Sequence, residues 1–452
     1  MAGCGRERAF ARQLDERLVH LALQPVRFSA VLWLPLTQGS RSQYRQPTFT
    51  QISTEDVDVP IPNRSLLSDL RGVTRMAIDA TDSIVEVVER IHRTVQLRPG
   101  PLGAPAADRA SGSAGLVYRN VRGGIRLVGR AVGASLAGIT TLLPEGESSP
   151  GRDAYRSVAN GVYGDYLLRT GNPLAIDMSL WHRGQRIDLD DPMRGLGRRS
   201  DVTPANRLLV LVHGLCMNDR QWSRDGHDHG AALANDHGFL PLYLRYNSGL
   251  QIVSNGRMLA EMLETLIGNW ATPVDELVIM GHSMGGLVAR SACHHGDEAG
   301  HVWRKYLRKL VFLGTPHHGA LLERGGHGLE VAMGLSPYSM PLTRLSKARS
   351  AGINDLRHGT ISGGDDIVPL PLGVKCYAAA AVRATKRSLL SERVIGDGLV
   401  TPDSALGRHI DSKRMLPIPR DRQWVGYGMG HRELLNRPEA YEQISRWLQD
   451  AG

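Results

Sequence analysis

The spacing of hydrophobic residues changes near residue 205 and divides the chain into two regions. Before that point, apolar residues recur every three or four positions, as on one face of a helix. Beyond it, short continuous apolar runs alternate with helical patterns, which is typical of parallel strands buried on both faces. We therefore expect an unassigned segment at 1–60, an accessory region at 61–204 and an α/β domain at 205–452.

The accessory region is predicted to contain helices and one β-hairpin. Its first helix, about 30 residues long, has an apolar stripe that we expect to dock on the rest of the protein. A coiled-coil dimer seam is the alternative, disfavoured by the alanines of the stripe. Two further helices are predicted at 117–143 and 151–169, after a linker at 97–115, and alternating apolar residues around Arg183-Gly184 predict the hairpin. The stripe consists of Leu66, Leu70, Val73, Ala77, Ala80, Ile84, Val87 and Ile91.

The α/β domain is predicted to have a mostly parallel central sheet with helices on both faces. Strand-like apolar runs occur at 208–212, 242–246, 277–280, 310–313 and 374–381. Helical patterns occupy 222–237, 251–270, 287–295 and 438–449.

Composition and charge exclude several classes of protein. With 452 residues, 42% of them hydrophobic and 22% charged, the chain is expected to form two globular domains. The net charge of +9 is not concentrated in a basic block and only 5% of residues are aromatic, so no nucleic-acid partner is expected. Arg greatly outnumbers Lys, which suggests a GC-rich bacterial genome. The net +6 within residues 1–200 supports the hypothesis of peripheral contact with an anionic membrane.

Targeting and cofactor signals are not found in the sequence. The chain opens MAGCGRERAF without an apolar segment, and its longest weakly polar run, 131–144, is too short to span a bilayer. We therefore expect a cytoplasmic protein. The four cysteines form no CxxC, and the histidine pairs lack metal-ligand spacing, so we expect neither a metal nor a cofactor.

The motif Gly281-His-Ser-Met-Gly-Gly286 carries the clearest chemistry. It follows an apolar strand and opens a helix, and its glycines suit a turn that is too tight for a Cβ. Such a turn presents Ser283 at the sheet edge in a strained backbone, as a nucleophile for an adjacent base. The expected oxyanion donors are the backbone N–H groups of Met284, after the serine, and of Leu215, after His213-Gly214. His213 itself is expected to shape that loop.

The base and the acid are sought after the serine, because the chain order in such folds is serine, acid, histidine. His431, just before the terminal helix, is the expected base. His409 lies only 12 residues after the acid candidate, too few for a helix, a strand and two turns. Asp397 is the expected acid because it follows the fifth strand. Asp365 and Asp366, before that strand, are the alternative acids, with a polar turn as their other interpretation.

Five motifs, in order, resemble those of the α/β-hydrolase lipases, in particular the bacterial triacylglycerol lipases and the GPI inositol-deacylase-like group. The resemblance covers residues 205–450 and implies the α/β-hydrolase fold, ester hydrolysis and the triad Ser283, Asp397 and His431. Residues 1–200 lie outside the resemblance, so the substrate cannot be carried over. The motifs are His213-Gly214, Gly281-His-Ser-Met-Gly-Gly286, Phe312-Leu-Gly-Thr-Pro-His317, Gly396-Asp-Gly-Leu-Val400 and Gly430-His431.

We therefore expect a serine carboxylic-ester hydrolase of the lipase or esterase type, acting on lipid or acyl-ester substrates. An acyltransferase or thioesterase with the same triad is the alternative, and a catalytically inactive binding protein is the third interpretation. Residues 320–357, rich in Leu, Met and Gly, are the expected lid, with an ordinary helical insertion as an equal alternative. The acyl preference and the oligomeric state are left open by the sequence.

Overall fold

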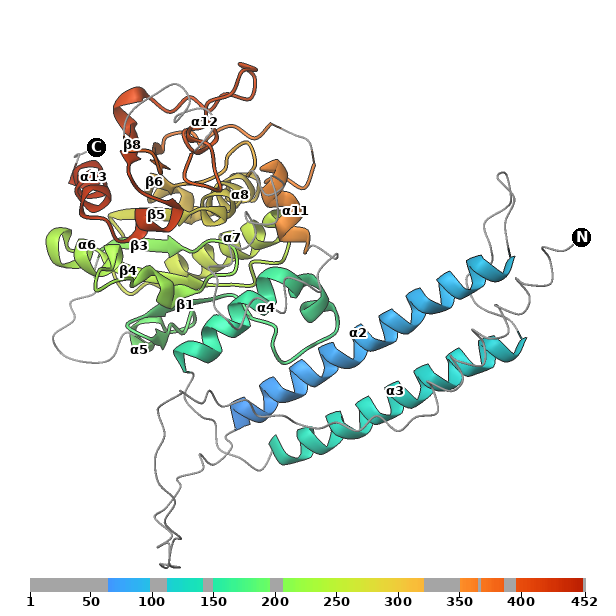
Figure 1. The fold of residues 1–452 in the computed structure, drawn as a ribbon. Helices are drawn as coiled ribbons and strands as arrows, with labels where there is room; N and C mark the ends of the chain where they lie inside the picture. Colours follow the sequence, from blue (N-terminus) through green and yellow to red (C-terminus); the bar gives the residue numbers. More distant parts are fainter. Residues whose placement is uncertain are drawn as a thin grey trace, which may run out of the picture. The chain divides into compact units, whose positions relative to one another are not determined.

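An eight-stranded sheet, in the order β2-β1-β4-β3-β5-β6-β7-β8, forms the centre of the computed structural model (Figure 1). The strands from β3 to β8 run parallel, whereas β1 is antiparallel to both β2 and β4. The structure describes residues 64–97, 112–140, 149–195, 206–320, 350–364, 367–385 and 396–449. The strands are β1 (Ser179–His182), β2 (Gln185–Arg186), β3 (Arg207–Val212), β4 (Leu240–Arg245), β5 (Glu276–His282), β6 (Leu307–Leu313), β7 (Lys375–Val382) and β8 (Gln423–Tyr427).

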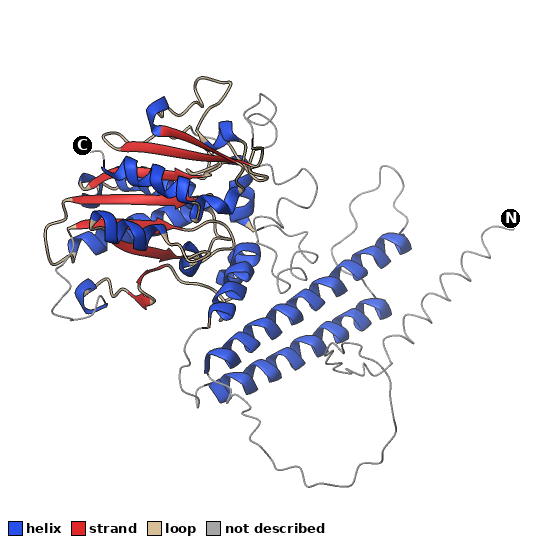
Figure 2. Ribbon diagram, turned by 60° about the vertical axis from the view of Figure 1, so that its left-hand side comes forward, coloured by secondary structure: helices blue, strands red, loops and turns tan. Residues whose placement is uncertain are grey.

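Helices cover both faces of the sheet (Figure 2). The continuous apolar strands require this, because successive side chains point to opposite faces. Along β3, Leu208 and Val210 pack in a core with α4, α7, α8 and α11, whereas Leu209 and Leu211 pack in a second core with α6 and α13. These helices are α4 (Pro150–Arg169), α6 (His229–His237), α7 (Ile252–Gly268), α8 (Met284–Glu298), α11 (Ala351–His358) and α13 (Pro438–Gln449). Shorter helices are α5 (Pro192–Gly195), α12 (Pro402–Ala405) and the 3-10 turns η1 (Asp219–Trp222), η2 (Val302–Lys305), η4 (Arg420–Arg422) and η5 (His431–Leu435).

The five predicted strands are confirmed, but the helix predicted at 222–237 is wrong in its first half. There, η1 ends at Trp222, and Asp225 and Gly226 both adopt positive φ, which interrupts any helix. A new helix begins after Asp228, whose side chain accepts a hydrogen bond from the Ala231 N–H. The last strand, β8, was not predicted, because its sequence QWVGY is short and mostly half-buried.

The predicted hairpin is confirmed around Arg183 and Gly184, whose φ angles of 48° and 77° suit a two-residue turn. Its placement differs from the expectation. Instead of lying in a separate accessory layer, β1 pairs with β4 and extends the central sheet, and Leu180 is fully buried in the core. The pairing leaves β2 as the short edge strand of the sheet.

Two long helices, α2 (Arg64–Leu97) and α3 (Gly112–Thr140), lie side by side (Figures 1 and 2). The three helices predicted before the hairpin are thus confirmed. The two helices approach closely at Gly129 of α3, where an added Cβ would lie 2.7 Å from the side chain of Ile78 on α2. None of the described helices is long and apolar enough to cross a membrane.

Where its side chains are described, from Leu70 to Ala80, the apolar stripe predicted to dock α2 is exposed. Leu70 and Val73 are 48% and 37% exposed. Asp69 pairs with Arg152 of α4, and the Gly72 carbonyl accepts a hydrogen bond from the side chain of Asn172, just after α4. Met76, outside the predicted stripe, packs against the apolar cluster of Ala159, Leu167 and Leu174. Residues 1–63, 98–111, 321–349 and 365–366, with the calls made on them, lie outside the described residues.

Candidate active site

Ser283 occupies a strained turn at the carboxyl end of β5. Its backbone has φ 54° and ψ −124°, a combination that L-residues rarely adopt. Two hydrogen bonds hold this conformation: the Ser283 N–H donates to the Leu313 carbonyl at 2.8 Å, and the Gly286 N–H donates to the Ser283 carbonyl at 3.1 Å. The strand and the helix α8 thus fix the serine from both sides. Ser283 is only 9% exposed.

The neighbouring glycines explain why the motif has no larger residue beside the serine. A Cβ on Gly281 would lie 2.4 Å from the Gly286 nitrogen. A Cβ on Gly285 would lie 2.1 Å from the Val212 carbonyl oxygen, at the end of the next strand. Both distances are shorter than any tolerated contact, so the turn and the first turn of α8 can pack only with glycine there.

His431 and Asp397 form a buried hydrogen-bonded pair. His431 Nδ1 lies 2.6 Å from Asp397 Oδ2, and the two residues are 4% and 1% exposed. The other carboxylate oxygen accepts the backbone N–H groups of Leu399 and Val400, both at 2.8 Å. Because Nδ1 donates to the carboxylate, His431 Nε2 is left as the acceptor, and this buried atom has no hydrogen-bond partner among the described residues.

The turn that carries His431 is itself held in place. His282 Nε2 donates to the His431 carbonyl at 3.2 Å, and a Cβ on Gly314 would come within 3.0 Å of the imidazole. Further along η5, His229 Nε2 donates to the Leu434 carbonyl at 2.9 Å. Burial lowers the pKa of His229 to about 4 and holds that of His282 well below its usual value, so both act as neutral supports.

The loop after β3 passes directly over the serine. A Cβ on Gly214 would lie 3.1 Å from Ser283 Cβ. His213 is fully buried, stacks on Tyr246 at 4.3 Å between ring centroids, and makes a 2.8 Å contact from Nδ1 to the Gly214 carbonyl. Burial lowers its pKa to about 3, in keeping with a residue that shapes the loop. The backbone N–H of Leu215 has no hydrogen-bond partner among the described residues.

The backbone N–H of Met284, the first residue of α8, also has no hydrogen-bond partner among the residues that the structure describes. Leu215 and Met284 are 3% and 0% exposed. Two buried N–H groups without a described partner, on the two segments that meet at Ser283, are available to a bound oxygen atom.

A small pocket, with a cavity volume of about 20 Å³, lies beside Ser283 and His431. Its walls are largely apolar, and Ala320 and Leu356, from the two described ends of the expected lid, belong to them. The middle of that expected lid, residues 321–349, lies outside the described residues. The remaining wall residues are Gly214, Leu215, Met217, His282, Leu399, Val400 and Arg432.

The other candidates are placed elsewhere or are not described. Asp365 and Asp366 lie outside the described residues. His409 lies beside His318, with 4.8 Å between ring centroids, and its Nδ1 accepts the Asp411 N–H, so it is not the partner of Asp397. The sequence reasoning missed the supporting role of His282, although its position beside the serine could have suggested it. It also missed Arg432, for which adjacency to His431 was the only signal.

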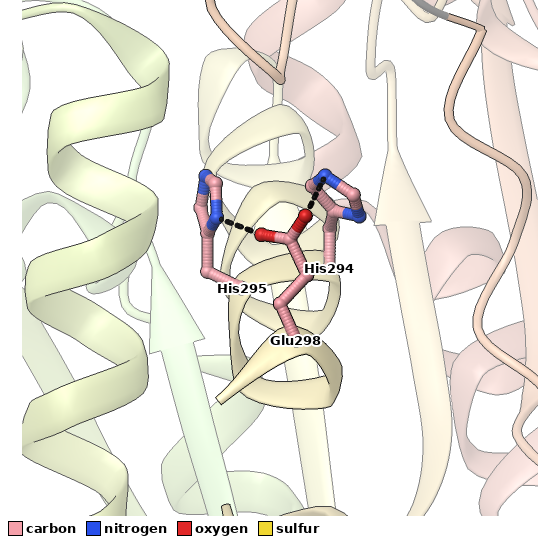
Figure 3. A group of neighbouring side chains, drawn as sticks. All are labelled: His294, His295 and Glu298. Carbon is pink, nitrogen blue, oxygen red and sulfur yellow. Dashed lines mark hydrogen bonds and ion pairs between the residues drawn. The ribbon is translucent and has the colours of Figure 1, made fainter. Parts of the chain in front are cut away.

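One further cluster of side chains has donor atoms of the kind that bind metals. On α8, the Glu298 carboxylate contacts His294 Nε2 at 3.4 Å and His295 Nδ1 at 2.9 Å (Figure 3). The Glu298 side chain is 58% exposed, and the second nitrogen of His295 has no described partner of the kind that usually orients a metal ligand. The contacts are those of an ion-pair cluster on a helix, and we assign no metal to it.

Comparison with known proteins links the α/β part to a family. Residues 204–386 match the family described as the PGAP1-like alpha/beta domain. No curated protein sequence matches the chain. The sheet topology and this family match assign the α/β-hydrolase fold to the chain.

Solved structures are similar to the chain at low identity. Bacillus licheniformis lipase BlEst2 in its mature form is 19% identical, with a TM-score of 0.40, over 55% of this chain and 94% of that one. A putative esterase from Staphylococcus aureus is 13% identical, with a TM-score of 0.38, over 61% and 81%. A hyperthermophilic esterase from Pyrobaculum calidifontis is 14% identical, with a TM-score of 0.36, over 55% and 75%.

Proposed function

We propose that this α/β hydrolase, which contains a PGAP1-like alpha/beta domain, is a serine hydrolase that cleaves carboxylic esters with Ser283, His431 and Asp397. The observation that carries the proposal is that His431, paired with the buried Asp397, lines the same pocket as a serine held in a strained turn. The unpartnered Nε2 of His431 is the atom that such a base uses to accept the serine proton.

The proposed reaction has two steps. Ser283 Oγ attacks the ester carbonyl while His431 Nε2 accepts its proton, and Asp397 stabilises the resulting imidazolium. The oxyanion accepts hydrogen bonds from the backbone N–H groups of Leu215 and Met284. His431 then protonates the departing alcohol, and a water molecule, deprotonated by the same imidazole, hydrolyses the acyl-enzyme.

The pocket favours substrates with an apolar acyl part. Leu215, Met217, Leu356, Leu399 and Val400 line it, and apolar walls with a few polar groups are typical of sites that bind acyl chains. Lipids or other acyl esters are therefore the proposed substrate class, and the insertion at 320–357 is the proposed lid over them.

Two other activities are compatible with the same residues. An acyltransferase or thioesterase would use the same acyl-enzyme but a different acceptor or leaving group. A catalytically inactive binding protein would retain the pocket without activating the serine.

The test is hydrolysis of p-nitrophenyl esters of graded acyl length by the purified full chain, with and without added alcohol or thiol acceptors. We expect hydrolysis that Ser283→Ala lowers by about 10³-fold or more. Cleavage of acyl-CoA with no hydrolysis of any ester would favour the thioesterase. Equal rates for the Ser283→Ala variant and the unmodified chain would contradict the proposal.

A further inference from the structure

Arg432 introduces a positive charge into the candidate active site. Among the described residues that line the pocket beside Ser283, it is the only one with a permanent charge. It directly follows His431 on η5, so its position is fixed by the same turn that carries the proposed base. The proposed ester hydrolysis does not use it.

This guanidinium has no counterion among the described residues. Two other arginines of the α/β part are paired with acids, Arg245 with Asp219 at 2.5 Å and Arg207 with Glu276 at 2.7 Å, and the buried Arg290 donates to the Val368 carbonyl at 2.6 Å. Arg432 forms no ion pair or side-chain hydrogen bond with any residue that the structure describes. Arg432 is half-buried, so a guanidinium that lines the pocket without an acidic partner keeps its donors available to an anion.

The surrounding charges strengthen this point. Burial, and then the like charge of Arg224, lower the pKa of Arg432. The Arg432 charge in turn contributes to lowering the pKa of His282 and opposes the rise that burial causes at Cys216. Arg432 lines the same pocket as His282, the residue before Ser283, and as Leu215, where a substrate ester would be held.

We propose that Arg432 binds an anionic group, a carboxylate or a phosphate, carried by the ester substrate, so that the site prefers anionic to neutral esters. The planar guanidinium matches either group with two parallel hydrogen bonds. A bound anion also offsets the repulsion between Arg432 and Arg224. This inference rests on the proposed ester hydrolysis at Ser283 and narrows its substrate class.

Two matched substrate pairs test the preference and identify the source of the anion. The first pair is p-nitrophenyl hexanoate and the mono-p-nitrophenyl ester of adipate, which differ by a carboxylate at the far end of the acyl chain. The second is a monoacylglycerol and the same compound with a 3-phosphate, which places the anion on the alcohol. For each pair, kcat/KM of the anionic ester is divided by that of the neutral one.

In the unmodified chain, we expect the ratio to favour the anionic ester in at least one pair. In Arg432→Gln, that ratio should fall at least about tenfold, mainly through a higher KM for the anionic ester. Arg420→Gln removes the same charge from an exposed position at the amino end of β8, away from the site, and should change neither ratio. No preference in the unmodified chain, or an equal fall for both members of each pair, would overturn the proposal.

Two further measurements keep the result interpretable. If Arg432→Gln unfolds, two measurements replace it: the preference of Arg432→Lys, and the salt dependence of the preference in the unmodified chain. Because salt screens charges, the preference for the anionic ester should weaken as NaCl is raised from about 20 to about 500 mM. An unchanged preference in both would overturn the proposal.

Binding of inorganic phosphate and of adipate to the Ser283→Ala chain, by calorimetry, separates the two claims. If no ester is hydrolysed but binding is lost in Arg432→Gln, the anion site stands and the hydrolase proposal fails. If esters are hydrolysed but Arg432→Gln alters neither binding nor preference, the anion site fails and the hydrolase proposal stands.

Discussion

At the residue scale, Asp397 does two things with one carboxylate. One oxygen accepts from His431 Nδ1, and the other accepts the N–H groups of Leu399 and Val400. The backbone bonds fix the rotamer of the side chain, and the side chain then fixes the tautomer of the imidazole. Both oxygens of the buried Asp397 carboxylate therefore have hydrogen-bond partners.

Asp397→Asn should separate position from charge. The amide oxygen can keep the two backbone bonds, but its NH₂ then faces His431 Nδ1 and favours the tautomer that has its proton on Nε2. That tautomer cannot accept the serine proton, so kcat should fall by about 10³- to 10⁴-fold. The melting temperature should change by only a few degrees.

The alternative acids supply the matched control for this variant. Asp366→Asn, and likewise Asp365→Asn, should leave ester hydrolysis within about threefold, since neither belongs to the proposed triad. Loss of activity in one of these variants, together with an active Asp397→Asn enzyme, would move the acid to that site.

At the element scale, the carboxyl ends of β3, β5 and β6 meet around one turn. The turn after β5 is bonded to Leu313 at the end of β6, and Gly285 approaches the end of β3. The site thus depends on close backbone packing between elements, and side-chain volume has no room to increase there.

Gly285→Ala tests this packing. Its methyl group would lie 2.1 Å from the Val212 carbonyl oxygen, so β3 or α8 must move, and the free energy of unfolding should fall by at least about 2 kcal/mol. Gly151→Ala on α4, where an added Cβ meets nothing within 4 Å, should keep or slightly raise stability. Urea unfolding curves compare the two, and equal midpoints would show that the close approach is not required.

A second element-scale prediction concerns α3 and the hypothesis of membrane contact. Leu127 and Val128 are 69% and 62% exposed on this helix, beside an exposed Arg130. If this helix meets an anionic lipid surface, replacing both apolar residues by Glu should lower co-sedimentation with phosphatidylglycerol vesicles by about fivefold or more. Leu372→Glu, at an exposed apolar residue of the α/β part, is the control, and equal losses in the two proteins would contradict a specific role for α3.

How much the sequence could predict varies among these elements. Continuous apolar runs located five strands because burial on both faces leaves no other pattern. The stripe on α2 misled, because the contacts toward α4 are made by the Asp69 ion pair and by Met76, which lie outside that stripe. Pairing of β1 with β4 and the approach of Arg432 to the pocket depend on segments distant in sequence, which spacing along the chain does not encode.

At the scale of the whole molecule, the fold buries several histidines in their neutral form. Burial lowers the pKa of His213 to about 3 and that of His229 to about 4, from an ordinary value of 6.5, and holds His282 and His317 well below it. In the unfolded chain, the same residues take up protons below pH 6.5. Stability therefore falls as the pH drops below 6.5, until the folded-state values are reached.

We expect the free energy of unfolding to fall by at least about 2 kcal/mol between pH 7.5 and pH 5.5, since each such histidine contributes up to about 1.4 kcal/mol per pH unit. Urea unfolding at the two pH values measures this. His229→Gln, which can still donate to the Leu434 carbonyl, should lose less unfolding free energy between the two pH values than the unmodified chain does. His358→Gln, at an exposed residue, should lose as much as the unmodified chain. Identical pH dependence in the two variants would show that the buried histidines are not its source.

The central claim is that Ser283 is a nucleophile activated by His431, and labelling with a fluorophosphonate followed by peptide mass spectrometry tests it most directly. We expect one modified serine, Ser283, in the full chain, no modification of Ser283→Ala, and at least about 10²-fold slower labelling of His431→Gln. Labelling of a different serine, or equal labelling rates with and without His431, would contradict it.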